Sequence, residues 1–272
     1  MTQTYIGPSS KREDAATLAE QVMAGSVRAV ARVVTLLENQ DLAGAAVLKY
    51  LTASAKRAMV VGITGYPGTG KSTLVDQLIT AYRRLGKRVG VLAVDISSPV
   101  TGGAVLGDRI RMQHHTDDQG VYIRSMATRG HHGGLARATR EALPVLEAAG
   151  YDVILIETVG VGQSEIDIMQ VAQTIVAVTA PGLGDDIQAM KAGLLEVANI
   201  VVVNKGDHEG ADAAIRDLRE CCTHVLRTVA LKGEGIPELI AVIAEHQRMQ
   251  DLDSPGLNKR TRRLIDRGAR GG

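Results

Sequence analysis

Residues 65–72 read GYPGTGKS, which fits the phosphate-loop pattern G-x-x-x-x-G-K-[ST] at every fixed position. Glycines in such a loop let consecutive backbone N–H groups turn inward toward phosphate oxygens. Lys71 is then placed to reach the β- and γ-phosphates, and the Ser72 hydroxyl to ligate Mg²⁺. The pattern therefore predicts a site for a nucleoside triphosphate, whose phosphate-binding residues are Gly65, Tyr66, Pro67, Gly68, Thr69, Gly70, Lys71, Ser72 and Thr73.

The sequence on both sides of this loop supports the prediction. Residues 58–64 (AMVVGIT) are apolar and rich in β-branched side chains, which favours a buried strand. Residues 72–85 have the periodicity of a helix. A strand that runs into the loop and a helix that begins in it are what phosphate binding needs, because the N-terminus of a helix attracts negative charge.

Further from the loop, apolar strand-like runs alternate with helix-like stretches. Most of these runs are continuous Val/Ile/Leu segments, which is typical of strands buried on both faces of a parallel sheet. The expected strands are 58–64, 88–94, 121–124, 152–157, 174–179, 199–203 and 226–229, and the last packed helix is expected at 236–248. The alternation predicts a doubly wound, mainly parallel α/β fold. Residues 13–55 read as helical, with a break at residues 39–41.

Composition limits the possible partners. The net charge is +1, and the chain has no Trp, no Phe and six Tyr. A base-stacking platform for nucleic acid is therefore not expected. No run approaches the length of a membrane span, and the polar N-terminus lacks the apolar centre of a signal peptide. We expect a cytoplasmic protein in which the adjacent Cys221 and Cys222 are inert thiols.

A second motif, NKGD at residues 204–207, directly follows the run 199–203. It matches the N-K-x-D pattern of GTPases. The Asp207 carboxylate would accept the N1–H and 2-amino hydrogens of guanine, and adenine offers neither in that geometry. Such a mismatch discriminates by about 10⁴. Asn204 would brace the loop, the stem of Lys205 would lie on the base, and a backbone N–H from Val229, Ala230 or Leu231 would reach the guanine O6.

Three carboxylates lie at the ends of predicted strands or in the loops that follow them: Asp95, Asp108 and Glu157. Ligands of open α/β sheets collect at the carboxyl ends of strands, and Mg²⁺ prefers oxygen ligands. We expect these acids and Ser72 to surround Mg²⁺, although each acid has a helix cap as its alternative role. The N–H of Gly160 would then sense the γ-phosphate.

Histidine pairs at 114–115 and 131–132 have no ligand spacing and are expected in surface loops rather than at a metal. No glutamine occupies the position of the water-positioning residue of small signalling GTPases, although Gln163 is close to it. Slow intrinsic hydrolysis and activation by a partner are expected. The sequence is divided into a helical region at 1–57, a GTPase domain at 58–248 and a short basic tail at 249–272.

Several segments together resemble the MeaB/ArgK/MMAA family, the GTPase chaperones of adenosylcobalamin-dependent acyl-CoA mutases. The segments are GYPGTGKST, VDISSPVTGGAVLGDRIRM, RSMATRGHHGGLARATRE, DVILIETVGVGQSE, APGLGDDIQAMKAGLLEVANIVVVNKGD and ALKGEGIPEL. The resemblance implies a SIMIBI-type P-loop GTPase, the group that includes the nickel-insertion and signal-recognition GTPases. It also implies switch segments at about 95–111 and 157–165.

The same resemblance implies a third switch at 181–191, in which Asp185 and Lys191 occupy functional positions. With Lys71, Glu157 and Gln163, these residues form the expected catalytic set. At the third switch, the residues themselves also allow a plainer role for Asp185 or Asp186, as the N-cap of a helix.

The resemblance further implies partners and a task. The chain would gate cofactor delivery to, and repair of, a mutase acting on methylmalonyl-CoA, isobutyryl-CoA or 2-hydroxyisobutyryl-CoA, and cobalamin would be bound by that client. An adenosyltransferase is a further candidate partner. The resemblance also implies a homodimer. Family members commonly dimerise through a helical arm that is longer than the segment after Gln247 here, so the mode of dimerisation is left open. The alternatives are a GTPase for nickel insertion, an ArgK-type kinase and a scaffold that binds GTP without turnover.

Overall fold

The computed structural model describes residues 14–51, 57–95, 115, 117–127, 134–158, 171–182 and 194–253. Within them, seven strands form one sheet in the order β3-β2-β4-β1-β5-β6-β7. Every neighbouring pair of strands is parallel. The strands are β1 (Met59–Thr64), β2 (Val89–Asp95), β3 (Val121–Ala127), β4 (Val153–Thr158), β5 (Thr174–Thr179), β6 (Ile200–Val203) and β7 (Val225–Arg227). The predicted α/β fold is confirmed.

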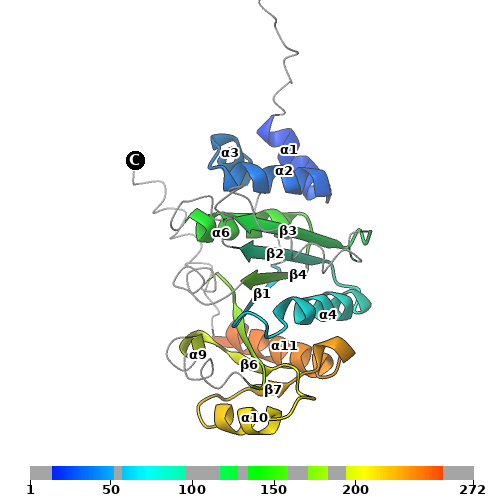
Figure 1. Cartoon of the computed structure of the whole chain (residues 1–272). Coiled ribbons are helices and arrows are strands. Elements are labelled where there is room, and N and C mark those ends of the chain that lie inside the picture. Colours follow the sequence, from blue (N-terminus) through cyan, green and yellow to red (C-terminus); the bar gives the residue numbers. More distant parts are fainter. Residues whose placement is uncertain are drawn as a thin grey trace, which may run out of the picture.

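Helices cover both faces of the sheet (Figure 1). Within the described ranges, the helices that follow the first strand are α4 (Lys71–Arg84), α6 (Gly134–Ala148), α9 (Leu194–Val197), α10 (Ala211–Arg219) and α11 (Ile236–Asp253), with a 3₁₀ turn, η2, at Ala230–Lys232. Alternate residues of one strand face opposite layers, as β4 illustrates. Leu155 belongs to the core shared with α4 and α11, whereas Ile154 and Ile156 belong to the core shared with α6. Both faces are therefore apolar, which explains the continuous hydrophobic runs in the sequence.

Among the described residues before the sheet there are three helices: α1 (Ala15–Met23), α2 (Val27–Glu38) and α3 (Leu42–Tyr50). The predicted break at 39–41 is present, but the prediction missed a second break at Ala24–Ser26. Gly25 has φ +79°, a conformation that L side chains rarely adopt, and the Ser26 hydroxyl caps α2 by accepting the Ala29 N–H at 3.3 Å. A cap signal inside an otherwise periodic helical stretch is the clue that separates the two helices.

The N-terminal helices share one hydrophobic core with a face of the sheet. Val30, Val33 and Val34 of α2 belong to the same buried cluster as Val145 and Leu146 of α6. Polar contacts between β3 and α2 add to this packing. Arg124 of β3 pairs with the nearly buried Glu38 of α2, and it also donates to the Thr35 hydroxyl at 3.0 Å. The first three helices therefore form a second layer over α6.

Two details differ from expectation. Helix α11 continues to Asp253 and so crosses the predicted boundary at residue 248. His115 was expected in a surface loop, but its side chain is buried, and Nε2 lies 3.0 Å from Asp76 Oδ1 on α4. The Asp76 carboxylate gives this imidazole a buried polar partner, which a histidine-pair pattern cannot reveal. His114, His131 and His132 lie outside the described residues. In the part of the chain that the structure describes, no helix is long and apolar enough to cross a membrane.

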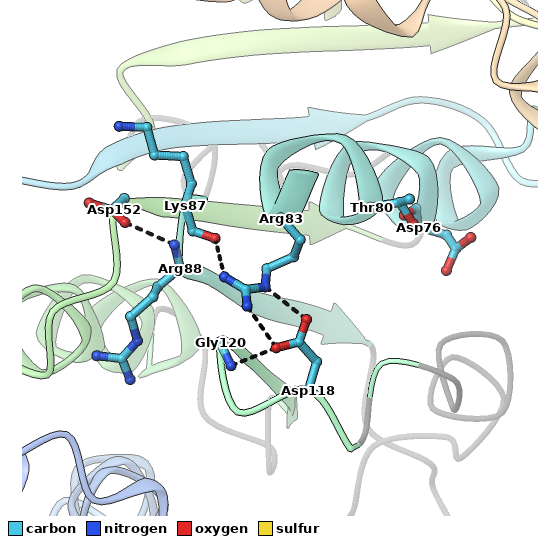
Figure 2. Close-up of polar contacts among 8 residues, drawn as sticks. All are labelled: Asp76, Thr80, Arg83, Lys87, Arg88, Asp118, Gly120 and Asp152. Atoms are coloured by element: carbon cyan, nitrogen blue, oxygen red, sulfur yellow. Dashed lines mark hydrogen bonds and ion pairs between the residues drawn. The ribbon is translucent and has the colours of Figure 1, made fainter. Parts of the chain in front are cut away.

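An ion pair fixes the far end of α4 against the start of β3 (Figure 2). Arg83 donates from Nε to Asp118 Oδ2 at 2.8 Å and from Nη2 to Oδ1 at 2.9 Å. Asp118 also accepts the N–H of Gly120 at 2.8 Å, and Arg83 Nη1 donates to the Lys87 carbonyl. These contacts fix the end of the helix that starts in the phosphate loop.

The ion pair between Arg83 and Asp118 should make the free energy of unfolding depend on pH. The Arg83 guanidinium and the Gly120 N–H hold the pKa of Asp118 below its ordinary value. A lowered folded-state pKa stabilises the protein above the unfolded pKa, near 3.9, and this contribution is lost as pH falls through the folded value. Because both side chains are partly exposed, Asp118→Asn should lower the free energy of unfolding by only about 0.5–1 kcal/mol at pH 7. Urea unfolding from pH 7 to pH 3 should show the difference shrinking below about pH 4.

Asp117→Asn is the matched control, since Asp117 is the exposed neighbour of Asp118. It should leave the urea midpoint unchanged over the same range. A loss for Asp118→Asn that stays constant with pH would contradict the proposed charge effect.

Candidate nucleotide-binding site

The phosphate loop connects the end of β1 to the start of α4, and two of its glycines are required by close contacts. Gly65 has φ +142°, and a Cβ there would overlap the carbonyl oxygen of Val178 in β5. Gly70 has φ +89°, and a Cβ there would overlap the amide nitrogen of Asn204. The first glycine lets the loop leave the sheet beside β5, and the second lets it approach the loop that follows β6. A larger residue at either position would displace the loop.

The side chain of Lys71 bends back over the loop. Its ammonium donates to the carbonyl oxygens of Gly65 at 2.8 Å and Tyr66 at 2.9 Å, and the residue is buried. These carbonyls hold the positive charge within the loop, beside the N-terminus of α4. The charge and the helix dipole together favour an anion at this position.

Ser72, the residue after Lys71, contacts the carboxyl end of β4. The Ser72 hydroxyl donates to Glu157 Oε1 at 2.7 Å, and both residues are buried. Glu157 lies near the end of β4, in register with Ile63 of β1 and Ala93 of β2. Asp95 ends β2 two positions after Ala93, so its backbone lies at the same edge of the sheet. The ends of β1, β2 and β4 thus lie at one end of the sheet, and Glu157 of β4 contacts the start of α4.

This donor set fits Mg²⁺. A hydroxyl and a carboxylate are the hard oxygen ligands that this ion prefers, and here they lie within hydrogen-bond distance of each other beside the phosphate loop. Mg²⁺ in proteins usually keeps several waters and is shared with substrate phosphates. Among the residues with described positions, no group of three or more His, Cys, Asp or Glu side chains could hold a metal.

Asn204 joins the phosphate loop to the loop after β7. Its Nδ2 donates to the Thr69 carbonyl at 2.9 Å. Its Oδ1 accepts the Thr228 hydroxyl at 3.1 Å and the Ala230 N–H at 3.0 Å. Its own N–H donates to the carbonyl of Thr179 at the end of β5. One buried amide side chain therefore sets the distance between two loops more than 130 residues apart in sequence.

The rest of the NKGD segment forms a tight loop beside Thr228. Lys205 has φ +54°, which is uncommon for a residue with a side chain and is typical of functional loops. The Gly206 N–H donates to the Thr228 carbonyl at 2.9 Å. Asp207 is exposed, and its Oδ2 lies 3.0 Å from Lys232 Nζ. The Lys232 ammonium lowers the pKa of this carboxyl, so Asp207 is ionised at neutral pH.

The structure brings some of the predicted residues together. One region at the carboxyl ends of the strands contains the phosphate loop, Glu157, Asn204 and the 229–231 segment. Glu157 contacts Ser72, and Asn204 contacts both Thr69 and Ala230. The Ala230 N–H donates to Asn204 Oδ1 and the Val229 N–H to the Glu234 carbonyl, while Leu231 is exposed. A contact between the 229–231 segment and guanine O6 stays a prediction. Predicted residues that lie outside the described ranges are Asp108, Gly160, Gln163, Asp185 and Lys191, and the side chain of Asp95 is likewise not described.

Sequence reasoning missed Lys232 as a member of the site. Lys232 follows the predicted 229–231 segment by one residue, but it lies 25 residues from the aspartate that it contacts. No spacing rule links the two. Only the folding of β7 and the η2 turn beside the NKGD loop brings them together.

The parallel sheet, the phosphate loop and the NKGD loop define a P-loop GTPase. A family model described as "Methylmalonyl Co-A mutase-associated GTPase MeaB" matches residues 30–268, and the chain belongs to this family. It is 48% identical over 260 residues to "Putative GTPase PH0274" of Pyrococcus horikoshii, covering 91% of this chain and 82% of that protein. It is 38% identical over 221 residues to "GTPase ArgK" of Escherichia coli, covering 78% and 67% respectively.

Among solved structures, the chain resembles the "LAO/AO transport system kinase" with a TM-score of 0.73. The match covers 97% of this chain and 83% of that one, at 24% sequence identity. At this identity the likeness supports the fold alone. The predicted family and the predicted GTPase activity are confirmed by the family match and the curated relatives.

Removing the Asn204 side chain tests whether it joins the two loops. Asn204→Ala leaves the Thr69 carbonyl and the Thr228 and Ala230 donors without this buried partner. The free energy of unfolding should fall by about 3 kcal/mol, because unsatisfied buried polar groups are costly. GDP affinity should fall at least tenfold, since the loops lose their relative position. Urea unfolding and calorimetric GDP titration measure the two effects.

Thr228→Val is the graded comparison, because it removes only one of these three bonds. It should cost about 1 kcal/mol and weaken GDP less. Equal losses for Thr228→Val and Asn204→Ala would argue against Asn204 as the link.

A second variant tests the magnesium assignment. Glu157→Gln keeps an oxygen that can accept the Ser72 hydroxyl but removes the negative charge. The Mg²⁺ concentration that gives half-maximal GTP hydrolysis should rise about tenfold or more. GDP affinity measured in EDTA should stay the same. Glu141→Gln on α6 serves as the control and should behave as the unaltered protein; an unchanged Mg²⁺ requirement for Glu157→Gln would remove this residue from the site.

Proposed function

We propose that this GTPase acts as a metallochaperone that gates loading and repair of adenosylcobalamin in an acyl-CoA mutase. The observation that carries the nucleotide part is the Asn204 side chain, which joins the phosphate loop to the loop beside the NKGD segment. The chaperone part is supported by the family match over residues 30–268. The name of that family refers to methylmalonyl-CoA mutase, and isobutyryl- and 2-hydroxyisobutyryl-CoA mutases remain equal candidates for the client.

In the proposed nucleotide complex, residues 65–73 bind the phosphates, and every one of them except Pro67 has a backbone N–H to offer. The Lys71 ammonium moves from the carbonyls of Gly65 and Tyr66 to the β- and γ-phosphate oxygens, exchanging one set of oxygen acceptors for another. Asp207 accepts the N1–H and 2-amino hydrogens of guanine. The site thus holds both ends of GTP, and the distance between them is set by the contact of Asn204 with Thr69.

We further propose that Ser72, Asp95, Asp108 and Glu157 hold Mg²⁺. When bound, the ion would neutralise charge on the β- and γ-phosphates during phosphoryl transfer. Ser72 and Glu157 already position their oxygens toward each other for this role. By accepting its hydrogen, Glu157 would orient the Ser72 hydroxyl, and burial of both groups would exclude bulk water from that side of the phosphates.

The switch residues complete the proposal. Gly160 would sense the γ-phosphate, and Gln163 is the candidate for positioning the attacking water. Asp185 and Lys191 would act in the third switch, through which a client would raise an intrinsically slow rate of hydrolysis. Cobalamin would be bound by the client. A homodimer, a cytoplasmic location and an adenosyltransferase as a further partner are parts of the same proposal.

Two alternatives are weaker. Insertion of nickel would call for a cluster of metal ligands on this chain, and the described residues contain no such group. An ArgK-type kinase would use ATP, whereas the relative ArgK is itself named a GTPase. Adenine also lacks the N1–H and 2-amino hydrogens that Asp207 would accept from guanine.

The test is GTP turnover by the purified protein, alone and with each of a panel of adenosylcobalamin-dependent acyl-CoA mutases. Slow turnover alone and a rise of at least tenfold with one mutase are expected. Lys71→Ala serves as the control for contaminating GTPases, because it removes the charge that contacts the phosphates. GTP turnover that responds to no mutase in the panel would contradict the chaperone role and leave the GTPase assignment intact.

A further inference from the structure

The carboxylate proposed to read guanine already has a cationic partner in the chain. Asp207 Oδ2 lies 3.0 Å from Lys232 Nζ, in a hydrogen bond with opposite formal charges. The side chains are 37% and 55% exposed respectively, so the pair is open to solvent. A surface ion pair of this kind adds little to folding stability. Its position at the base site suggests an effect on ligand recognition instead.

The segment that carries Lys232 is firmly held. The Lys232 N–H donates to the Val229 carbonyl at 2.9 Å, which closes the η2 turn. Val229 exchanges backbone hydrogen bonds with Glu234, and Ala230 is bonded to Asn204. The backbone at Lys232 is therefore fixed relative to the same Asn204 that anchors the phosphate loop. Ordering the Lys232 side chain therefore costs rotamer entropy but no further backbone entropy.

The contact leaves room for guanine. A carboxylate has two oxygens, and each oxygen accepts two hydrogen bonds. Guanine would use one acceptor position on each oxygen through its N1–H and 2-amino groups. The ammonium uses only one position on Oδ2, so it need not leave when guanine binds. A cation in that place holds the carboxylate ionised and limits its rotation.

We propose that Lys232 is a positioning residue for base recognition, which orients the Asp207 carboxylate to accept the N1–H and 2-amino hydrogens of guanine. This inference rests on the proposed role of Asp207. In this proposal Lys232 acts through that carboxylate and does not contact the phosphates. Its influence should therefore depend on how many hydrogen bonds a base makes to Asp207.

The experiment measures dissociation constants of GDP, IDP and XDP by calorimetry. The hypoxanthine of IDP keeps N1–H but lacks the 2-amino group, so it makes one bond to Asp207 where guanine makes two. Lys232→Ala should weaken GDP about two- to fivefold, as expected for an exposed ion pair, and IDP less. Lys232→Arg should stay within about twofold of the unaltered protein, because a guanidinium can pair with the same oxygen.

A double-variant cycle shows whether the effect passes through Asp207. In an Asp207→Asn background, Lys232→Ala should cause no further loss of GDP affinity. Lys87→Ala, an exposed lysine on the loop after α4, is the matched control for loss of one positive charge. The midpoint of thermal unfolding without nucleotide should be unchanged in Lys232→Ala and in Lys87→Ala. This result would separate a positioning role from a structural one.

The outcomes separate the two proposals. Asp207→Asn should weaken GDP and improve XDP; if it changes neither, the assignment of Asp207 is wrong and the inference about Lys232 falls with it. If Asp207→Asn behaves as expected, two results would overturn the role of Lys232 alone. One is GDP binding by Lys232→Ala that is unchanged or tighter, the latter meaning that the lysine competes with the base. The other is a loss that adds fully to that of Asp207→Asn.

Discussion

The site depends on one buried amide. A nucleotide spans two loops, one for the phosphates and one for the base, and affinity requires a fixed distance between them. Asn204 provides it through bonds to Thr69 on one side and to Thr228 and Ala230 on the other. An amide suits this task because it donates and accepts at once. Gly70 has no side chain, which allows Asn204 to come this close.

The amide can act in this way because the sheet beneath it is rigid. Strands β1, β5 and β6 are adjacent and buried on both faces, so their carboxyl ends have little freedom. The phosphate loop leaves β1, and Asn204 follows β6. The strand between them, β5, contributes the Thr179 carbonyl that accepts the Asn204 N–H. The buried strands hold the loops at their carboxyl ends in place. Ligand binding by these loops can then depend on a few polar groups.

The sequence predicted the strands closely because their apolar runs are continuous and bounded by loop residues. All seven begin within one residue of the expected positions. It failed where the deciding interaction is between distant residues. The burial of His115 depends on Asp76, and the pairing of Asp207 depends on Lys232. Neither leaves a periodic signal. The break at Gly25 and Ser26 was readable from a local cap, but the apolar spacing on both sides obscured it.

The layered arrangement of the N-terminal helices has a practical consequence. Because α2 covers α6 and is tied to β3 through Glu38 and Arg124, the helices and the sheet share one interior. A fragment that begins at the first strand would expose apolar side chains of α6 to water and leave Arg124 without its carboxylate. The smallest piece suitable for crystallisation or isotope labelling would therefore begin before α1, even though the nucleotide contacts begin only at Gly65.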